Sequence, residues 1–419
     1  MLDADGNALS GVLVSWNAAN GSSVFGRTAD TTNIAGRAAA EWTLALTEGE
    51  QSVSIRAGEL DPITVTATAT QFHAASVTVG GGFACALTGS GRAFCWGRNN
   101  YGQLGTGAVG DSTLVPTPVA GDIVFTVLTA GGAHACGLTA DGTAYCWGYN
   151  ENGETGTGTT GSSVPAPTPV QTALRFTQIS AEGLGEFSGS TCGLTAAGEA
   201  WCWGDNMFGK LGDGTTTNSA VPVRVQSDVP FSFIQTGYFH SCAVATTGEL
   251  WCWGEQESDP GAFGARPAGL YLTPVALHEG FQFTRLSTGR NFTCGLNAEH
   301  TAFCWGADSE GGLGNGEVES SAVPLPVAGG HSYATISSAS HEETIALTTG
   351  AELYRWGSPG NDVPQTTPVR VTELPFFDMD SGELPFDNLN GACGRLVDTA
   401  VYCVRDDGVV RGVLAPVTP

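Results

Sequence analysis

The sequence is short of positive charge and of long apolar runs. Its 419 residues include 16 basic ones, of which Lys210 alone is a lysine, against 41 acidic ones, and the formal net charge is −25. A surface this acidic repels the phosphates of nucleic acids and of anionic membranes. No apolar run approaches the length that spans a bilayer. We therefore expect no nucleic-acid partner and no membrane insertion.

Helical patterning is also missing. Charged residues make up only 14% of the chain, and no segment repeats apolar residues at the helical period. The 60 glycines instead supply the positive φ angles that tight turns between short strands need. Disorder is excluded because 10 tryptophans and 19 phenylalanines provide ample side chains to bury. The composition predicts an all-β fold.

Most of the chain consists of a repeated unit that ends in Trp-Gly. Six copies are clear, and a seventh, eroded copy runs from Cys393 to Val404. Each unit reads as a hairpin, a polar loop, a Pro-bounded strand and a fourth apolar strand, with proline on an outer edge where a missing N–H is tolerated. Four strands in each of seven repeats predict a closed ring. The six clear copies, spaced by 50 to 56 residues, end at Trp96, Trp147, Trp203, Trp253, Trp305 and Trp356.

The two ends of the repeat array indicate how the ring closes. The first repeat lacks an upstream Pro-bounded strand, whereas the last residues, Ala415–Pro419, supply one without a hairpin. We therefore expect the C-terminal segment to close the ring against the first repeat, near Ala74–Val79.

The repeat resembles the regulator-of-chromosome-condensation repeat. Residues 96–107 read Trp-Gly-Arg-Asn-Asn-Tyr-Gly-Gln-Leu-Gly-Thr-Gly and match the pattern Trp-Gly-x-Asn-x-x-Gly-x-Leu-Gly-x-Gly nearly throughout. The likeness extends over residues 76 to 419, in the cysteine-bearing form common in exported bacterial proteins. It implies a seven-bladed β-propeller, which we assign to residues 71–419. It does not imply one function, since fold and function separate freely.

The cysteines are predicted to form disulfides within single repeats. The members of each pair stand symmetrically about a hairpin turn, which places two sulfurs opposite each other on neighbouring strands. The sixth repeat has Ile345 and Arg355 at these two positions, and their joint change favours a bond between them in the other repeats. The spacing does not fit a zinc site, and reduced core cysteines are the alternative. The predicted pairs are Cys85 with Cys95, Cys136 with Cys146, Cys192 with Cys202, Cys242 with Cys252, Cys294 with Cys304, and Cys393 with Cys403.

Disulfides imply an oxidising compartment. We therefore expect a bacterial protein that is extracellular, displayed at the cell surface or periplasmic. The nuclear, nucleosome-binding role of the family's namesake fits poorly with this location and with the acidic charge.

Residues 1–70 carry no Cys-Trp-Gly unit. The turn Asp3–Gly6 leads into an alternating strand that ends at Trp16, and further strands are predicted at 36–44, 51–55 and 63–68. The segment resembles the bacterial immunoglobulin-like modules of invasin-type surface proteins, without the first strand or two. We interpret it as a partial Ig-like β-sandwich from a larger array, which leaves one sheet edge unpaired.

Motifs for catalysis, cofactors and metals are weak. The segment Gly204–Leu211 nearly spells a phosphate-binding loop, but Leu211 stands where Ser or Thr must reach Mg²⁺. Neither Asp3–Asp5 nor Asp205–Asn206 continues to the glutamate of a calcium loop. Nucleophile-elbow and zinc-protease motifs are missing. We therefore expect no catalytic residues, no cofactor and no metal.

A binding surface is predicted on the loops that precede the first cysteine of each repeat. Ring symmetry brings these loops to one end of the channel, and two of them, at 182–189 and 383–390, are longer than the others. Their aromatic and polar residues are typical of recognition hot spots. The alternative is that the residue two before each cysteine plugs the channel or caps a turn. The predicted ligand-binding residues are Phe83, His134, Tyr238, Phe239, His240, Arg290, Phe292, His341 and Glu342.

The expected function is non-enzymatic binding of a protein or glycan through one face of the ring. One alternative is a lyase or glycoside hydrolase at the channel mouth, which requires two carboxylates or a His–carboxylate pair converging there. The other is a structural spacer of a surface array.

Overall fold

The structure, a computed structural model, describes residues 7–413 except 19–22, 26–28, 40–41, 45–48, 59, 70–71, 183–188, 257–259, 265, 339–342, 358–363, 384–389, 397–399 and 406–409. Two compact units are present, Met1–Phe72 with Arg411–Pro419, and His73–Val410. All regular elements among these described residues are strands. None of the described residues forms a helix long and apolar enough to cross a membrane.

The first unit contains, in its described part, a four-stranded sheet and a two-stranded sheet. Trp16 lies opposite Ile55 and Val53 opposite Val65, so these apolar residues share one face of the larger sheet. Val14, Trp16 and Val53 are buried there. The larger sheet has the order β3(Ala29–Thr31), β1(Leu13–Ala18), β5(Gly49–Ala57), β6(Ile63–Ala69), and β2(Ser23–Phe25) pairs with β4(Trp42–Leu44).

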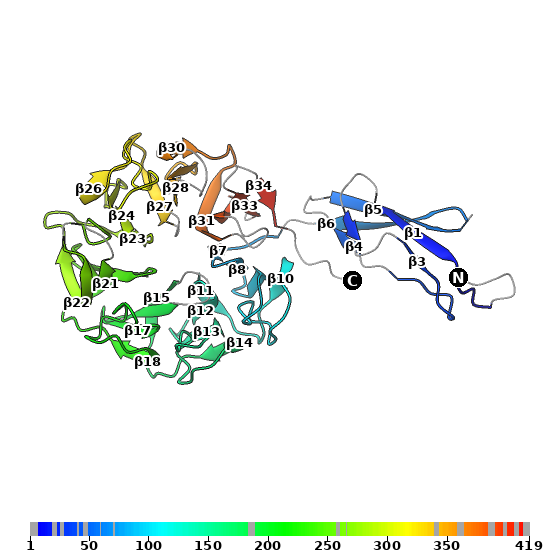
Figure 1. Ribbon diagram of the computed structural model, residues 1–419, viewed down its shortest axis with the longest axis horizontal. Coiled ribbons are helices and arrows are strands. Elements are labelled where there is room, and N and C mark those ends of the chain that lie inside the picture. The colour runs from blue at the N-terminus through cyan, green and yellow to red at the C-terminus, as the bar shows by residue number, and fades with distance from the viewer. Residues whose placement is uncertain are drawn as a thin grey trace. The chain divides into compact units, whose positions relative to one another are not determined.

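The second unit is a ring of sheets, each formed by four strands consecutive in the chain (Figure 1). The described residues form seven of them. The first three are β7(Ser76–Val79), β8(Phe83–Leu87), β9(Ala93–Gly97) and β10(Thr113–Pro118); β11(Phe125–Ala130), β12(His134–Thr139), β13(Ala144–Tyr149) and β14(Ser163–Pro169); β15(Phe176–Glu182), β16(Ser190–Thr195), β17(Ala200–Gly204) and β18(Ser219–Arg224). The next two are β19(Phe231–Thr236), β20(His240–Ala245), β21(Leu250–Gln256) and β22(Gly269–Leu277); β23(Arg285–Thr288), β24(Phe292–Leu296), β25(Ala302–Gly306) and β26(Ser321–Pro326). The last two are β27(Tyr333–Ser338), β28(Glu343–Thr348), β29(Leu353–Gly357) and β30(Gln365–Arg370); β31(Phe376–Glu383), β32(Asn390–Leu396), β33(Val401–Arg405) and β34(Val410–Gly412).

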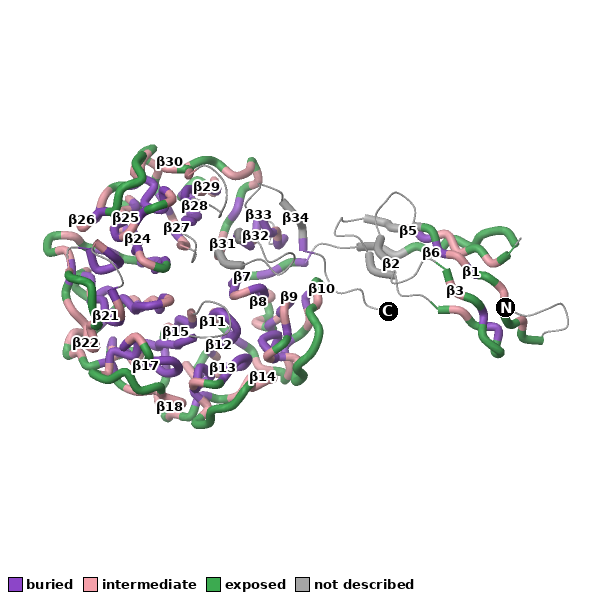
Figure 2. The backbone as a smooth tube through the Cα atoms, viewed as in Figure 1, coloured by how far each residue is buried: buried purple, intermediate pink, exposed green. Residues whose placement is uncertain are grey.

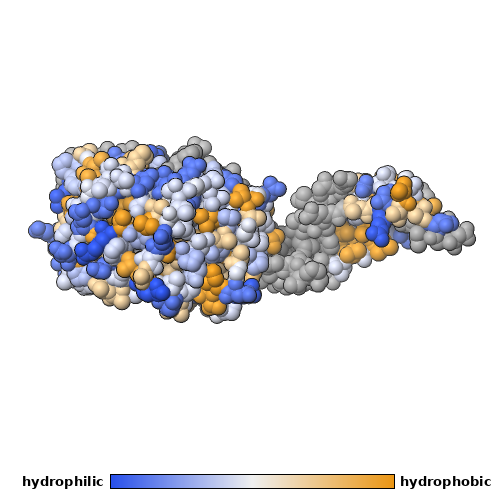
Figure 3. All heavy atoms as spheres, turned by 90° about the horizontal axis from the view of Figure 1, so that it is seen from below, coloured by the Kyte–Doolittle hydropathy of each residue, from blue (hydrophilic) through white to orange (hydrophobic). Residues whose placement is uncertain are grey.

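The first strand of each sheet lines the centre of the ring and the fourth lies at the outer edge. Buried residues follow the inner strands, and exposed residues gather on the outer rim (Figure 2). The repeated prolines lie in the outer strands, which confirms their predicted edge position. On the outer wall, hydrophobic residues are interspersed among hydrophilic ones (Figure 3). The prolines include Pro116, Pro165, Pro222, Pro274, Pro324 and Pro368.

The strands of one sheet begin at a different point of the repeat than the sequence analysis assumed. The apolar segment before each glycine turn is the first strand of a sheet, and the Pro-bounded strand is the fourth strand of that same sheet. The first sheet is therefore complete within 76–118 and lacks no upstream strand. The expected closing segment, Ala415–Pro419, lies outside the described residues.

Tryptophans join neighbouring sheets. Trp147 Nε1 donates a hydrogen bond to the backbone oxygen of Gln103 in the preceding sheet's loop, at 3.0 Å. Gly105 has φ +67°, and a Cβ atom there would lie 2.8 Å from the Trp147 Nε1 atom. The Leu-Gly pair of the motif is thus required where the next indole packs. Equivalent bonds run from Trp253 to Lys210, from Trp305 to Ala262 and from Trp356 to Gly312.

The six cysteine pairs are disulfides, as predicted, and each joins the second and third strands of one sheet at directly opposed positions. The alternative of reduced core cysteines is therefore wrong. The sixth sheet has Ile345 opposite Arg355 instead. Arg355 Nη1 lies 3.9 Å from Oε1 of the buried Glu343, so an ion pair stands beside the position of the missing bridge. The bonds join Cys85 to Cys95, Cys136 to Cys146, Cys192 to Cys202, Cys242 to Cys252, Cys294 to Cys304, and Cys393 to Cys403.

Mass spectrometry checks the bridges directly. The intact mass without reductant is expected to lie twelve hydrogens below the fully reduced mass, two for each of the six bonds. Each bond closes a short loop and contributes about 2–3 kcal/mol to stability in the chain-entropy model. Free thiols in the purified native protein would contradict both the pairing and the oxidising compartment.

Side chains also connect the inner strands around the ring. The hydroxyl of Thr78 accepts a hydrogen bond from the Ala130 amide, and the hydroxyl of Thr129 accepts one from the Ala181 amide. Ser180 and Ser287 accept the amides of Thr236 and Ser338 in the same way. The first, second, third and fifth sheets thereby each bind the inner strand of the next sheet.

A carboxylate replaces the hydroxyl where the last sheet meets the first. Asp380 stands opposite Cys393, the register position that Thr78 holds opposite Cys85. Its Oδ2 accepts the Thr78 hydroxyl and the Val79 amide, each at 2.9 Å, and its Oδ1 accepts the hydroxyl of Ser337 at 3.1 Å. Asp380 therefore bonds to both neighbouring sheets, the sixth and the first.

Candidate functional site

Two sets of loops meet at one end of the ring. The loop between the first and second strands of a sheet and the loop between its third and fourth strands lie at the same end, because adjacent strands are antiparallel. Backbone bonds tie the two loops together, from Glu255 N to Phe239 O and from Ala307 N to Asn291 O. The loops that carry the predicted site residues therefore share this end with the loops that follow Trp-Gly.

An aromatic cluster lies at this end, across the third, fourth and fifth sheets. Phe208 comes from the loop between β17 and β18, Tyr238 and Phe239 from the loop between β19 and β20, and Arg290 from the loop between β23 and β24. The ring centroids of Phe208 and Tyr238 lie 4.9 and 4.1 Å from that of Phe239. The Arg290 guanidinium lies over the Phe239 ring, 5.6 Å from its centroid. We call these four residues, with the exposed Met207, the aromatic patch.

The patch combines a fixed floor with accessible edges. Phe239 is buried, Phe208 and Tyr238 are half-buried, and Arg290 is exposed. Rigid aromatic side chains, methionine and arginine are the residue types that contribute most at protein interfaces.

Four of the other predicted site residues are enclosed by the fold. Phe83, His240 and Phe292 have no exposed surface and His134 is 1% exposed, so no ligand contacts them in this conformation. All four stand two positions before a cysteine, which is where the alternative interpretation expects plugs or turn caps. His341, Glu342 and most of the two long loops, at 183–188 and 384–389, lie outside the described residues.

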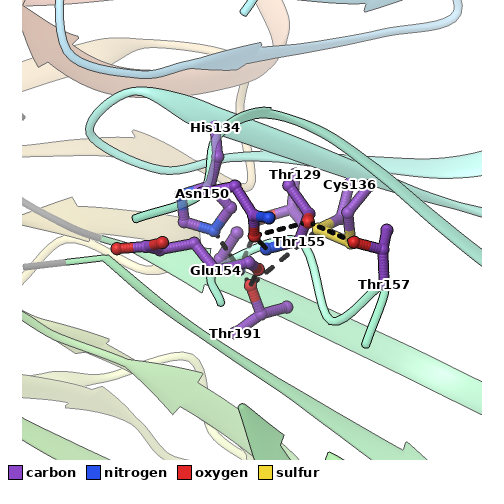
Figure 4. Close-up of a disulfide and its surroundings, with 10 residues drawn as sticks. Thr129, His134, Cys136, Asn150, Glu154, Thr155, Thr157 and Thr191 are labelled. Atoms are coloured by element: carbon purple, nitrogen blue, oxygen red, sulfur yellow. Dashed lines mark hydrogen bonds between the residues drawn. A yellow bond between two sulfur atoms is a disulfide. The ribbon is translucent and has the colours of Figure 1, made fainter. Parts of the chain in front are cut away.

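The buried histidines belong to the joints between sheets. His134 Nε2 lies 2.9 Å from Thr191 Oγ1 of the next sheet, beside the Cys136 disulfide (Figure 4). His240 contacts Thr293 of its own next sheet in the same way, at 3.3 Å. Burial, with a smaller contribution from the positive charge of Lys210, lowers the pKa of His134 to about 4 and that of His240 to about 3. Both rings are therefore neutral at physiological pH.

These histidines predict acid sensitivity. Their folded-state pKa values lie below the unfolded value, so the unfolded chain takes up protons first as the pH falls. Their contribution is complete above about pH 6.5 and is lost toward the folded pKa values, at about 1.4 kcal/mol per pH unit for each histidine. Urea unfolding measured from neutral to mildly acidic pH checks this slope. A His134→Asn/His240→Asn variant is expected to show a shallower decline, and an unchanged decline would contradict the assignment.

The segment that resembles a phosphate loop encloses an ion pair instead. Lys210 Nζ lies 3.3 Å from Asp205 Oδ2, and the side chains are 0% and 5% exposed. Glu154 is buried nearby, and burial raises the pKa of its carboxyl group. Burial has the opposite effect on the ammonium group of Lys210 and lowers its pKa, while the negative charges of Asp205, Glu154 and Glu182 oppose that shift. The ion pair closes the loop that carries Met207 and Phe208.

Met207 and Phe208 were missed by sequence reasoning. They lie in the segment that nearly spells a phosphate-binding loop, and the ring that Phe208 contacts, Phe239, comes from another repeat. A signal was present, since Tyr101 and Phe208 stand at equivalent positions, five residues after Trp96 and Trp203. Tyr101 also packs on an aromatic ring of the next sheet, that of Tyr149, at 5.0 Å.

The inner strands enclose a cavity of about 280 Å³ lined mainly by polar residues. Asp380 lies in its wall, and Asp378 stands two residues away on β31. Burial and the charge of Asp380 raise the pKa of Asp378, and a backbone hydrogen bond from Val77 opposes the rise. Asp380 accepts three hydrogen bonds from the chain, two from the first sheet and one from the sixth. Among the described residues, no three His, Cys, Asp or Glu side chains gather as metal ligands.

Curated relatives match most of the chain. The ultraviolet-B receptor UVR8 of Arabidopsis thaliana is 29% identical over 310 residues, which is 70% of this chain and 69% of that protein. The mitochondrial RCC1 domain-containing protein RUG3 of the same plant is 29% identical over 313 residues, with the same coverage of both chains.

Solved structures match the ring. Human WBSCR16 has a TM-score of 0.67 at 21% identity, covering 81% of this chain and 92% of that one. Yeast RCC1 (Prp20), crystallised with Kap60, has a TM-score of 0.63 at 16% identity, covering 81% and 80%. At these identities the likeness concerns the fold, which is that of a β-propeller.

Two family models, both described as the regulator of chromosome condensation (RCC1) repeat, match the chain. One matches residues 90–138, 141–181 and 197–244, and the other matches 74–103, 126–154 and 231–258. These segments contain the Cys-Trp-Gly units that end at Trp96, Trp147, Trp203 and Trp253. In these matched segments, the chain carries the RCC1 repeat.

Proposed function

We propose that this chain is a protein-binding β-propeller of seven blades, one for each sheet of the ring, and that its contact surface is the aromatic patch. The observation that carries the proposal is the convergence of Phe208, Tyr238, Phe239 and Arg290 from three sheets at one end of the ring. A cluster of this composition has the character of an interface hot spot.

Similar proteins support protein binding. The UVR8 relative is a receptor, and the yeast propeller was crystallised with a protein, Kap60. Another structure of that yeast propeller, Prp20p, was described with its binding to Gsp1p and histones. We extend binding of a protein to this chain, without a catalytic role, and identify none of these partners as its own.

The patch residues provide the test. Tyr238→Ala together with Arg290→Ala is expected to weaken partner binding at least tenfold, or about 1.4 kcal/mol. The melting temperature is expected to stay close to that of the wild type, because Tyr238 is half-buried and Arg290 is exposed. Titration calorimetry with the purified partner, alongside thermal unfolding, separates the two effects.

Phe377→Ala is the matched control. Phe377 is 59% exposed and also carries an arginine over its ring, with Arg395 4.0 Å from the centroid. It lies at the start of an inner strand, and therefore at the opposite end of the ring from the patch. Equal losses of binding in the control and in the patch variant would refute this location of the surface.

The cellular setting is part of the same proposal. We place the protein in an oxidising compartment, exported from a bacterial cell or displayed on it, because all twelve cysteines are paired. The sheets of the first unit are proposed to be a partial Ig-like module that acts as a spacer.

A further inference from the structure

We propose that the partner segment bound at the aromatic patch is positively charged and inserts an apolar side chain between Met207, Phe208 and Tyr238. This inference rests on the proposed function and adds the chemical class of the partner. Three features carry it: the shape of the patch, the charge of the surrounding loops, and the position of Arg290.

The patch offers a place for one apolar anchor. Phe208 and Tyr238 both pack edge-on against the Phe239 ring. Phe208 and Tyr238 lie 6.5 Å apart, so the three rings form one continuous surface. Met207, the neighbour of Phe208 in the chain, is 57% exposed, and a flexible thioether adapts to an incoming side chain.

The loops at the patch end of the ring carry more acidic than basic residues. Among the described residues of the loops at this end, the exposed or half-buried basic residues are Arg98, Arg266 and Arg290. Clustered charge of one sign attracts a partner of the opposite sign and speeds its association. The net charge of −25 adds to the same field. The acidic loop residues with equal access are Asp111, Glu151, Asp213, Glu310, Glu317 and Glu319.

The positive charge of Arg290 does not outweigh the negative charge of the loops at this end of the ring. Its guanidinium lies over the Phe239 ring, where the aromatic face attracts it and holds it at the border of the patch. The backbone bond between Ala307 and Asn291 places the start of the next loop beside Arg290, and that loop carries Glu310, Glu317 and Glu319. A partner at the patch therefore meets an apolar floor with acidic residues beyond it.

Other occupants fit less well. A glycan stacks on aromatic rings but gains nothing from acidic surroundings when it is neutral, and an acidic glycan is repelled. A second copy of this chain carries the same negative charge and is repelled as well. A basic protein segment uses both features of the surface.

The test is a selection from a phage-displayed library of random linear peptides on the intact, oxidised chain. Enriched peptides are expected to be rich in Lys and Arg around one apolar residue and to bind Tyr238→Ala at least tenfold more weakly. Peptides that depend on Tyr238 but are neutral or acidic overturn the cationic partner and leave the proposed function standing. Peptides that bind the Tyr238→Ala variant as tightly as the wild type overturn the proposed function itself. A library with no enrichment, beside a glycan panel that binds and depends on Tyr238, overturns the protein segment as occupant.

Variants of two acidic residues test whether the partner segment is recognised by its positive charge. Glu317→Gln/Glu319→Gln is expected to slow association of an enriched peptide about threefold at low salt, with the difference vanishing at high salt. The matched control is Glu279→Gln/Glu299→Gln, which removes the same charge from exposed positions at the other end of the ring. Equal slowing by both pairs would show that only net charge acts, and would overturn local recognition of a cationic segment.

Discussion

Replacing Lys210 by methionine is expected to lower the free energy of unfolding by about 3–5 kcal/mol, because it leaves a buried carboxylate without its cation. The Lys210 side chain is fully buried, its Nζ lies 3.3 Å from Asp205 Oδ2, and Glu154 is enclosed in the same region. Methionine matches the length of lysine but brings no charge. Urea unfolding of the oxidised protein at neutral pH measures the loss.

The double variant Lys210→Met/Asp205→Asn is the control for this prediction. It removes both charges, and the sister loop of the first sheet already holds the neutral Gln103 at the position of Lys210. We expect most of the lost stability to return, since replacing both members of a buried ion pair costs far less than removing one. A single variant as stable as the wild type would show that the pair contributes nothing.

Asp380→Ala is expected to lower the free energy of unfolding by about 3 kcal/mol or more, because it removes three hydrogen bonds to one charged acceptor and leaves the Val79 amide without that acceptor. The bonds lie where the last sheet meets the first. Thr129→Ala is the matched control, since it removes one neutral bond, to the Ala181 amide, from an equivalent inner strand. We expect that change to cost about 1 kcal/mol.

The comparison of the two variants tests the role of the joint. Thermal unfolding at neutral pH, with all disulfides intact, gives both values under the same conditions. Equal destabilisation by Asp380→Ala and Thr129→Ala would mean that the joint between the last and first sheets is no different from the others.

Features that repeat along the chain were predictable from the sequence. The tryptophan spacing, the paired cysteines and the prolines of the outer strands each recur at a fixed position, so the copies reinforce one interpretation. The sixth repeat has Ile345 and Arg355 in place of both cysteines, which identified the pairing because a cross-strand disulfide needs both partners. The register places these two residues opposite each other. For these features, the residues within a single repeat were enough to predict the structure.

Contacts between sheets were not predictable in the same way. Asp380 belongs to the eroded last repeat, and its partners Thr78 and Val79 lie some 300 residues earlier in the chain. The patch joins Phe208 to residues of the next repeat, and a single sequence does not show which loops face each other. The burial of individual predicted site residues was not predictable for the same reason. His134 and Tyr238 both shortly precede the first cysteine of a repeat, but His134 begins β12 and is enclosed by the ring, whereas Tyr238 lies in a loop and is half-buried.

The central claim, that the aromatic patch is the surface that binds a protein, is tested most directly by photo-crosslinking. A photoreactive phenylalanine analogue is placed at Met207, within the patch, or at Phe377, at the opposite end of the ring, where the native side chains are 57% and 59% exposed. The partner used is one that binds the wild type and loses binding to Tyr238→Ala/Arg290→Ala. We expect a crosslink to that partner from position 207 and none from position 377. A crosslink from position 377 alone, or equal yields from both positions, would contradict it.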